Sequence, residues 1–314
     1  MEENMKIDEK LFTPLTAEEK RVDSVVRPSV GYWKDAWGRL KSNRMALVSL
    51  IIIVVIMLAA FILPYFLPFT YDGTDLAIAN QSPSKTHIFG TDQLGRDIFV
   101  RVLYGAKYSL IIGIAAAIIN LFIGVLYGGI SGFLGGKVDS IMMRIVDILY
   151  SIPLTIYVII LMAILYDPNS GNSGLGTIIL ALSISYWIGM ARIVRGEVLQ
   201  LKQQEFVLAA RALGASKTRI LLRHLIPNCV GSIIVTMTLL IPQAIFTEAF
   251  LGFIGIGLVP PLASLGTLAN EAQKTIYTYP YQLLFPSIMI CLIILAFNLF
   301  GDGLSEALDP KNKK

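Results

Sequence analysis

The sequence is short of charged residues, cysteine and histidine, and each shortage excludes a class of protein. Charged residues make up 15% of the 314 residues, whereas soluble globular domains carry about 25%. Two histidines, His87 and His224, and two cysteines, Cys229 and Cys291, are too few for a catalytic triad or a metal cluster. The sequence therefore predicts no catalytic, cofactor-binding or metal-binding residues, and two buried free thiols rather than a disulfide.

The sequence consists mainly of apolar segments, because 55% of the residues are hydrophobic. A helix that crosses a bilayer requires about 20 predominantly apolar residues, and six segments have that length. They are Ala46–Leu67, Tyr108–Ile130, Ile145–Leu165, Ser173–Ala191, Leu225–Thr247 and Gln282–Gly301. The sequence predicts an all-α membrane protein with six transmembrane helices. Since the first 45 residues are polar, we expect the first span itself to direct insertion.

The distribution of lysine and arginine predicts which side of the membrane the termini face. An even number of spans places both termini on one side, and the segments on that side hold 21 of the 26 lysine and arginine residues. Positively charged loops remain in the cytoplasm, so we expect both termini and the 192–223 loop to be cytoplasmic. The net charge of +4 is then a topology signal and implies no nucleic-acid partner.

This topology divides the chain into five sections. Residues 1–45 form a cytoplasmic N-terminal tail, whose last part places Trp33, Trp37 and Leu40 at helical spacing among basic residues. Such an amphipathic segment is typical of a helix that lies on membrane lipid. The other sections are the first span at 46–67, an external loop at 68–107, a five-helix core at 108–303 and a cytoplasmic tail at 304–314.

A polar, basic stretch from Glu205 to Asn228 separates two apolar spans. Its first part predicts a short helix with Phe206, Ala209, Ala210 and Leu213 on one face, ended by Gly214. Ser216 can cap a second, basic helix that runs to Pro227. A small apolar face with no core of its own fits the groove of a partner protein. The alternative interpretation is an ordinary basic cytoplasmic loop.

The residue order of this stretch favours the first interpretation. The pair Ala209-Ala210, Gly214 four residues later and Pro227 thirteen residues after that glycine resemble the EAA loop of bacterial ABC-importer permeases. The whole stretch is most similar to the C-type permease subunit of oligopeptide and dipeptide importers. The resemblance implies an ATPase-coupling helix formed by Glu205, Phe206, Val207, Leu208, Ala209, Ala210, Arg211, Ala212, Leu213, Gly214 and Ala215. Leu208 replaces the family's acidic residue, and Glu205 lies one turn earlier.

A second stretch, HIFGTDQLGRDIFVRVLYGAKYSL, resembles the segment that the same family carries before its second span. The matching residues are Gly90, Asp92, Gly95, Arg96, Asp97, Arg101, Gly105 and Ser109. Asp92, Arg96 and Asp97 are close enough in sequence to pair locally. We expect a structural role that closes the outer face, because charge clusters are more often structural than ligand-binding.

Four glycines, Gly124, Gly128, Gly132 and Gly136, recur every four residues at the end of the second span. Small residues at that spacing let two helices approach closely, although the pattern does not identify the partner helix. Gly136-Lys137 is no phosphate-binding loop, because Ser131 and Val138 occupy the positions that require glycine and serine or threonine. We expect the chain itself to bind no ATP.

Polar residues near the ends of the spans are further candidates. Asp147, inside the third span, is expected to pair with Arg144, and Pro153 to kink that helix. The irregular segment after the fifth span resembles a family segment near the translocation path. This resemblance implies that a translocation path or outer gate includes Glu248, Phe250, Asn270 and Glu271. The alternative interpretation of these residues is an interfacial loop.

The resemblance implies the fold and the assembly. The fold is that of a type I ABC-importer permease in the bacterial plasma membrane. The partners are a sister permease that completes the pore, two cytoplasmic ATPases that bind ATP and Mg, and an external substrate-binding protein. Peptides are the expected cargo, with nickel or another small solute as the alternative. A stand-alone secondary transporter or channel is the competing class, but it requires mid-membrane charges and paired broken helices.

Overall fold

The computed structural model describes residues 31–165 and 173–309, and within these ranges all regular elements are helical. A single isolated bridge joins Thr91 to Asp97. The predicted tail at 1–30 and the last residues, 310–314, lie outside the described ranges. The prediction of an all-α chain is confirmed for the part that the structure describes.

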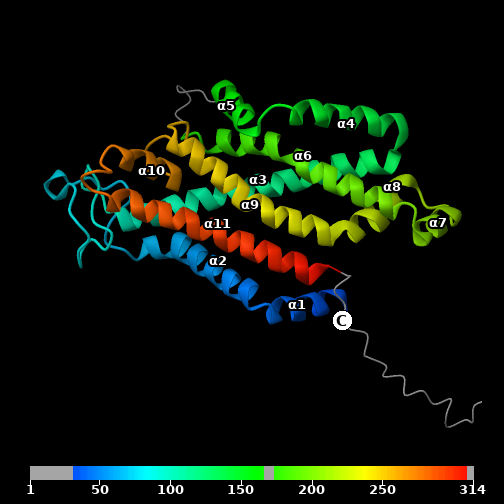
Figure 1. Cartoon of the computed structure of the whole chain (residues 1–314), viewed down its shortest axis with the longest axis horizontal. Coiled ribbons are helices and arrows are strands. Elements are labelled where there is room, and N and C mark those ends of the chain that lie inside the picture. Colours follow the sequence, from blue (N-terminus) through cyan, green and yellow to red (C-terminus); the bar gives the residue numbers. More distant parts are fainter. Residues whose placement is uncertain (1–30, 166–172, 310–314) are drawn as a thin grey trace, which may run out of the picture.

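Eleven α-helices, α1 to α11, make up most of the described chain (Figure 1). Their bounds are Tyr32–Ser42, Arg44–Ile62, Ile98–Leu134, Gly136–Tyr150, Leu154–Leu165, Leu175–Leu201, Glu205–Ala212, Lys217–Arg219, Val230–Phe253, Leu265–Gln273 and Tyr281–Leu308. Short 3-10 turns occupy Leu63–Tyr65, Leu76–Ile78 and Ile226–Cys229, and a π-helical turn occupies Ile220–Leu225.

Five continuous helical segments of the described chain are long and apolar enough to cross a membrane, and the number is six when a bent pair of helices is counted as one span. The bent pair is α4 and α5, whose axes differ by 86°. The break falls at residues 151–153, where Pro153 was predicted to kink the third span. Proline lacks an amide hydrogen and forces its predecessor out of the helical conformation, so the chain turns here.

Several helices extend beyond the predicted spans. Helix α3 begins at Ile98, so residues 98–107 of the predicted external loop are helical, and Asp97 caps them by accepting from the amide of Val100. Residues 131–144, which connect the second and third predicted spans, are also helical apart from Gly135, which adopts a φ of 67° between α3 and α4. Apolar runs mark the part of a helix that suits lipid, whereas caps decide where the helix ends.

Helix α6 is the partner of the glycine stripe on α3, and the two helices lie side by side (Figure 1). A Cβ atom on Gly128 would stand 2.2 Å from the carbonyl oxygen of Ala191. Gly124 and Gly132 meet the same helix, at Met190 and Arg195. Gly136 instead begins α4, so three of the four glycines serve close packing.

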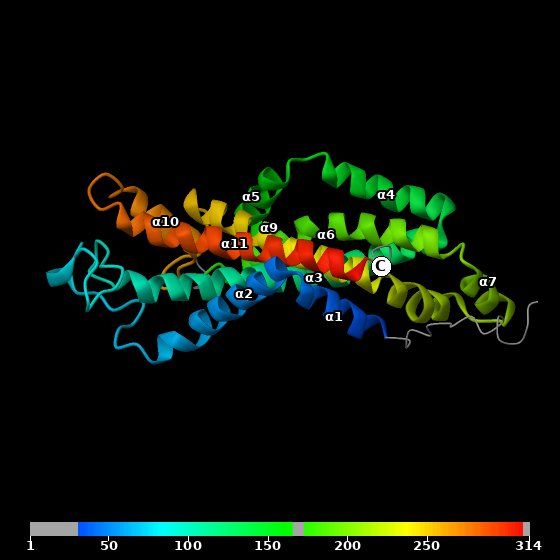
Figure 2. The same ribbon diagram turned by 60° about the horizontal axis from the view of Figure 1, so that its bottom comes forward.

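The predicted amphipathic segment is helix α1, which packs against the end of α11 (Figure 2). The hydroxyl of Tyr32 donates to the carbonyl oxygen of Leu308 at 3.2 Å. Trp33 and Trp37 are exposed, while Leu40 is buried. The arrangement leaves the two tryptophans free to face lipid.

The ion pair predicted for Asp147 is wrong in its partner. Asp147 accepts from Arg192 of α6 at 2.7 Å, and no ion pair with Arg144 exists among the described residues. Helix α4 lies alongside α6 (Figure 1), so an arginine of the neighbouring helix reaches the carboxylate. Sequence proximity favoured Arg144, but the fold brings Arg192 to the carboxylate.

Candidate functional site

The two candidate regions lie at opposite ends of the long axis of the molecule (Figures 1 and 2). Helix α7, the predicted coupling helix, is at one end, and the segment before α3 lies with α10 at the other. About the length of α3, a helix of 37 residues, separates them. At a rise of about 1.5 Å per residue, that length exceeds the hydrocarbon core of a bilayer.

Helix α7 ends at a glycine, as predicted. Gly214 has a φ of +79°, its amide donates to the carbonyl oxygen of Arg211 at 2.9 Å, and the amide of Ala215 donates to that of Ala210 at 3.0 Å. These two bonds define a Schellman motif, which satisfies the last carbonyl groups of a helix. No atom lies within 4 Å of a Cβ added at Gly214, so only backbone conformation restricts this position.

Helix α7 buries one face and exposes an apolar one. Val207 is fully buried and Ala210 is nearly so. Phe206, Leu208 and Leu213 are exposed, Leu213 by 89%, and Ala209 and Ala212 are exposed beside them. The predicted face therefore loses Ala210, which anchors the helix, and gains Leu208. Helix α7 therefore presents a partly exposed apolar face, a feature typical of protein–protein contact surfaces.

The predicted second helix is not a separate element. Ser216 does cap it, accepting from the amide of Arg219, but the helix does not stop at Pro227. It passes through a π-helical turn and a 3-10 turn into α9, so one helical segment runs from Lys217 to Phe253. The proline breaks the regular hydrogen bonding without ending the helix, because the irregular turns accommodate it. The turn after α7 is thus joined directly to a membrane span.

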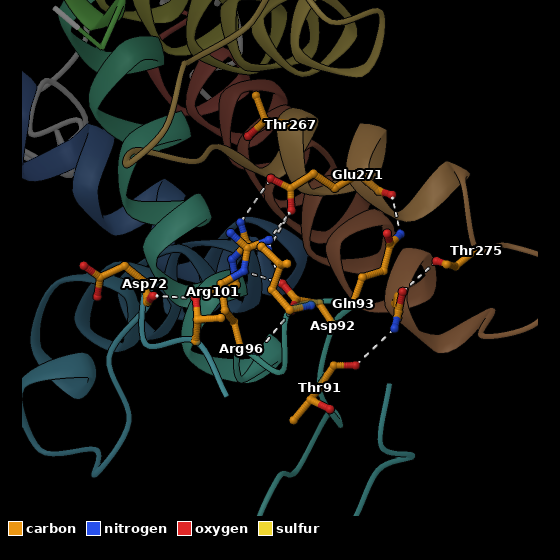
Figure 3. Close-up of polar contacts among 12 residues, drawn as sticks. Asp72, Thr91, Asp92, Gln93, Arg96, Arg101, Thr267, Glu271 and Thr275 are labelled. Atoms are coloured by element: carbon orange, nitrogen blue, oxygen red, sulfur yellow. Dashed lines mark hydrogen bonds and ion pairs between the residues drawn. The ribbon is translucent and has the colours of Figure 1, made fainter. Parts of the chain in front are cut away.

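At the other end, Asp92, Arg96, Arg101 and Glu271 form what we name the outer ionic cluster (Figure 3). Arg101 lies between Asp92 and Glu271, with Nη1 at 2.5 Å and 2.7 Å from their carboxylate oxygens. Arg96 contacts the same two carboxylates at 2.7 Å and 2.8 Å. The cluster ties the segment before α3 and the first turn of α3 to α10.

Local backbone geometry positions this cluster. One oxygen of Asp92 accepts from the amides of Leu94 and Arg96, at 2.9 Å and 3.0 Å. Gly95, at a φ of +73°, has no room for a side chain, since a Cβ would stand 1.7 Å from the carbonyl oxygen of Asp75. The predicted local pair of Asp92 and Arg96 is confirmed. Asp97 instead contacts Nδ1 of His87 at 2.8 Å.

The four residues predicted for a path or outer gate each occupy a different environment. Glu248 is fully buried and accepts from the hydroxyl of Ser109 at 2.7 Å. Glu271 belongs to the outer ionic cluster. Asn270 donates to the carbonyl oxygen of Phe253 at 2.6 Å, and Phe250 is exposed on α9. The structure does not gather them into one site.

A further, partly buried ion pair was not predicted from the sequence. Asp139, in the first turn of α4, accepts two bonds from Arg195 of α6, at 2.5 Å and 2.6 Å, and one from Ser131 of α3 at 2.6 Å. The three residues come from three helices, so no local spacing reveals them. They hold the turn between α3 and α4 against α6, near the end of the molecule that carries α7 (Figure 1). Among the described residues, no group of three or more histidine, cysteine or acidic side chains could hold a metal ion.

Two protein-family models match the chain. The model for the binding-protein-dependent transport system inner membrane component matches residues 124–314, and the model for the N-terminal TM domain of oligopeptide transport permease C matches residues 31–83. Together they include α7, the glycine stripe and the first span.

Full-length relatives and a solved structure are also similar. The oligopeptide transport system permease protein OppC of Bacillus subtilis is 51% identical over 308 residues, covering 98% of this chain and 99% of the relative. The dipeptide transport system permease protein DppC of the same organism is 46% identical over 314 residues, covering 100% and 96%. The inward-facing MetNI methionine ABC transporter matches with a TM-score of 0.53 at 18% identity, over 66% of this chain and 96% of that one. That likeness shows the fold. The chain therefore belongs to the family of binding-protein-dependent transport system inner membrane components, as a multi-pass, non-catalytic permease subunit of a bacterial ABC importer.

Proposed function

We propose that the chain is one of two permease subunits in an importer of oligopeptides or dipeptides. The names of its relatives, an oligopeptide and a dipeptide permease at 51% and 46% identity, support this cargo. The remaining partners are a sister permease, an external substrate-binding protein and two cytoplasmic ATPases, which bind ATP and Mg. In this assembly the chain carries out no bond chemistry and transmits motion to the pore.

The exposed apolar face of α7 is the observation that carries the proposal. Val207 and Ala210 fix the helix to the body of the chain, while Phe206, Leu208 and Leu213 point outward. A Leu213 side chain exposed by 89% gains little from the fold of this chain, but it gains about 1.5–3 kcal/mol if a partner buries it. We assign that partner to the ATPase subunit, because α7 corresponds to the resembled family's coupling helix.

The mechanism follows from the connection of α7 to α9. When ATP draws the two ATPases together, α7 moves with the surface that it contacts, and the helical segment from Lys217 transmits the displacement into the membrane. The ATP-bound ATPases must favour one pore state over the other, since a ligand shifts an equilibrium only by its differential affinity. The Schellman motif at Gly214 maintains the angle between α7 and that segment.

The test is a substitution that alters only the outward face. Leu213→Asp should leave abundance and folding unchanged, because the side chain has few intramolecular contacts, but it should abolish co-purification of the ATPases and peptide uptake. Leu76→Asp is the matched control, an equally simple change at a leucine exposed by 68% at the opposite end. ATPase binding and uptake at wild-type levels in the Leu213→Asp variant would refute the proposed role of α7.

A further inference from the structure

Two adjoining hollows lie among α4, α5, α6, α9 and α11, outside both regions described so far. The larger, of about 560 Å³, is lined by the break between α4 and α5 and by Ser185 and Gly189 of α6. The smaller, of about 330 Å³, extends to Phe246 of α9 and Asn298 of α11. They meet at Leu154, Tyr186 and Gln243, which line both. Their volumes fall in the range of about 300–1,000 Å³ that small-molecule sites occupy.

Polar groups meet in these hollows at the middle of their helices. Tyr186, Gln243 and Asn298 each lie ten or more residues from either end of α6, α9 and α11. The hydroxyl of Tyr186 hydrogen-bonds to that of Thr247 at 2.6 Å and donates to the main-chain carbonyl oxygen of Gln243 at 3.2 Å. These contacts fix the orientation of the tyrosine ring against α9.

The side chain of Gln243 is exposed and makes no hydrogen bond to any described residue. An unsatisfied amide in hydrocarbon costs several kcal/mol. By contrast, the exposed residues along the middle of α2 are apolar, among them Ile51, Val55 and Leu58, as lipid requires. Gln243 therefore faces water, a polar ligand or a polar group of the sister permease rather than lipid.

We propose that these hollows form the cargo-binding part of the translocation pathway and bind the backbone of a peptide. None of the residues that line them is charged, so they offer no carboxylate or imidazole ligand for a metal ion such as nickel. The carboxamide of Gln243, which has no hydrogen-bond partner among the described residues, offers a donor and an acceptor that match those of a peptide unit. Tyr157 and Phe246 add aromatic surface for side chains of varied size. This inference rests on the proposed function and extends it to cargo contact.

Gly189 provides the most direct way to block the hollow. It lines the larger hollow, and no atom lies within 4 Å of a Cβ placed there. Gly189→Phe should fill the cavity without displacing a neighbour. The importer should still assemble and hydrolyse ATP, but peptide uptake should fall at least tenfold. Gly176→Phe is the matched control, because this glycine lies on the same helix with the same open space and lines neither hollow. It should transport normally.

Chemical labelling tests the water exposure of the hollow independently of transport. In a variant whose Cys229 and Cys291 are replaced by serine, Gln243→Cys should react with a charged, water-soluble thiol reagent, and peptide cargo should slow the reaction. Ile51→Cys, exposed by 53% on α2, should stay unlabelled. Normal uptake by Gly189→Phe, or an unreactive Gln243→Cys, would overturn the inference. If Leu213→Asp still abolishes uptake in that case, the proposed function stands. A wild-type importer that takes up no peptide overturns both proposals.

Discussion

At the outer-loop end, two arginines and two carboxylates join the segment before α3 to α10, whereas no ion pair among the described residues involves α7. Arg101 is 5% exposed and contacts carboxylates on two elements. Helix α7 depends on backbone hydrogen bonds and two buried apolar side chains, and its other face remains apolar and open. The difference is that the ion pairs of the outer-loop end form within this chain, while the α7 end presents an apolar face that we propose a partner covers.

The same backbone motif occurs at both ends, which makes the comparison sharper. Gly255 ends α9 as Gly214 ends α7: its amide donates to the carbonyl oxygen of Gly252, and the amide of Ile256 donates to that of Leu251. Gly255 has a φ of +88°, and a Cβ there also meets no atom within 4 Å. The two glycines are therefore equivalent in local strain, and only their surroundings differ.

The prediction with the largest expected effect concerns which side of the membrane each end of the molecule faces. A reporter that is active only in the cytoplasm should be active when it is fused after Ser216 and silent when it is fused after Asp75. The excess of lysine and arginine on the α7 side predicts this orientation. Activity in the opposite pattern would place α7 outside the cell, beyond the reach of a cytoplasmic ATPase.

The next effect concerns the stability of the outer-loop end. Arg101→Met should destabilise the protein by about 3 kcal/mol, because removing one partner leaves Asp92 and Glu271 with a single arginine, and breaking a buried ion pair costs about 3–5 kcal/mol. Thermal unfolding of the purified protein in detergent measures the change. Lys85→Met, at an exposed lysine of the same segment, is the control and should leave the unfolding temperature unaltered. An equal effect of both substitutions would mean that the outer ionic cluster contributes nothing specific.

The sequence predicted the features that local order determines. The end of α7 at Gly214, the cap at Ser216 and the pairing of Asp92 with Arg96 all depend on residues within a few positions of one another. The sequence did not predict the contacts between residues far apart in the chain. Arg192 lies 45 residues from Asp147, and Glu271 lies 170 residues from Arg101. The hollows around Tyr186 and Gln243 combine residues of α4, α5, α6, α9 and α11, and no single helix sequence shows which polar residues meet there.

The interpretation of Ala210 shows the same limit within a single helix. Helical spacing places it near Phe206 and Leu213, and sequence alone assigned it to the exposed face. Packing against the turn before α9 instead buries it with Val207. The period of a pattern identifies an apolar stripe, but only the tertiary fold decides which edge of the stripe is covered.

Co-purification of the ATPases with Gly214→Val and with Gly255→Val tests the central claim most directly. A left-handed conformation costs an ordinary residue about 1–2 kcal/mol and a β-branched residue more, so both variants carry the same local strain. We predict at least a tenfold loss of bound ATPase for Gly214→Val, recovery in Gly214→Asn because asparagine tolerates this conformation, and no loss for Gly255→Val. Equal ATPase association in Gly214→Val and Gly255→Val would contradict the assignment of α7 as the coupling helix.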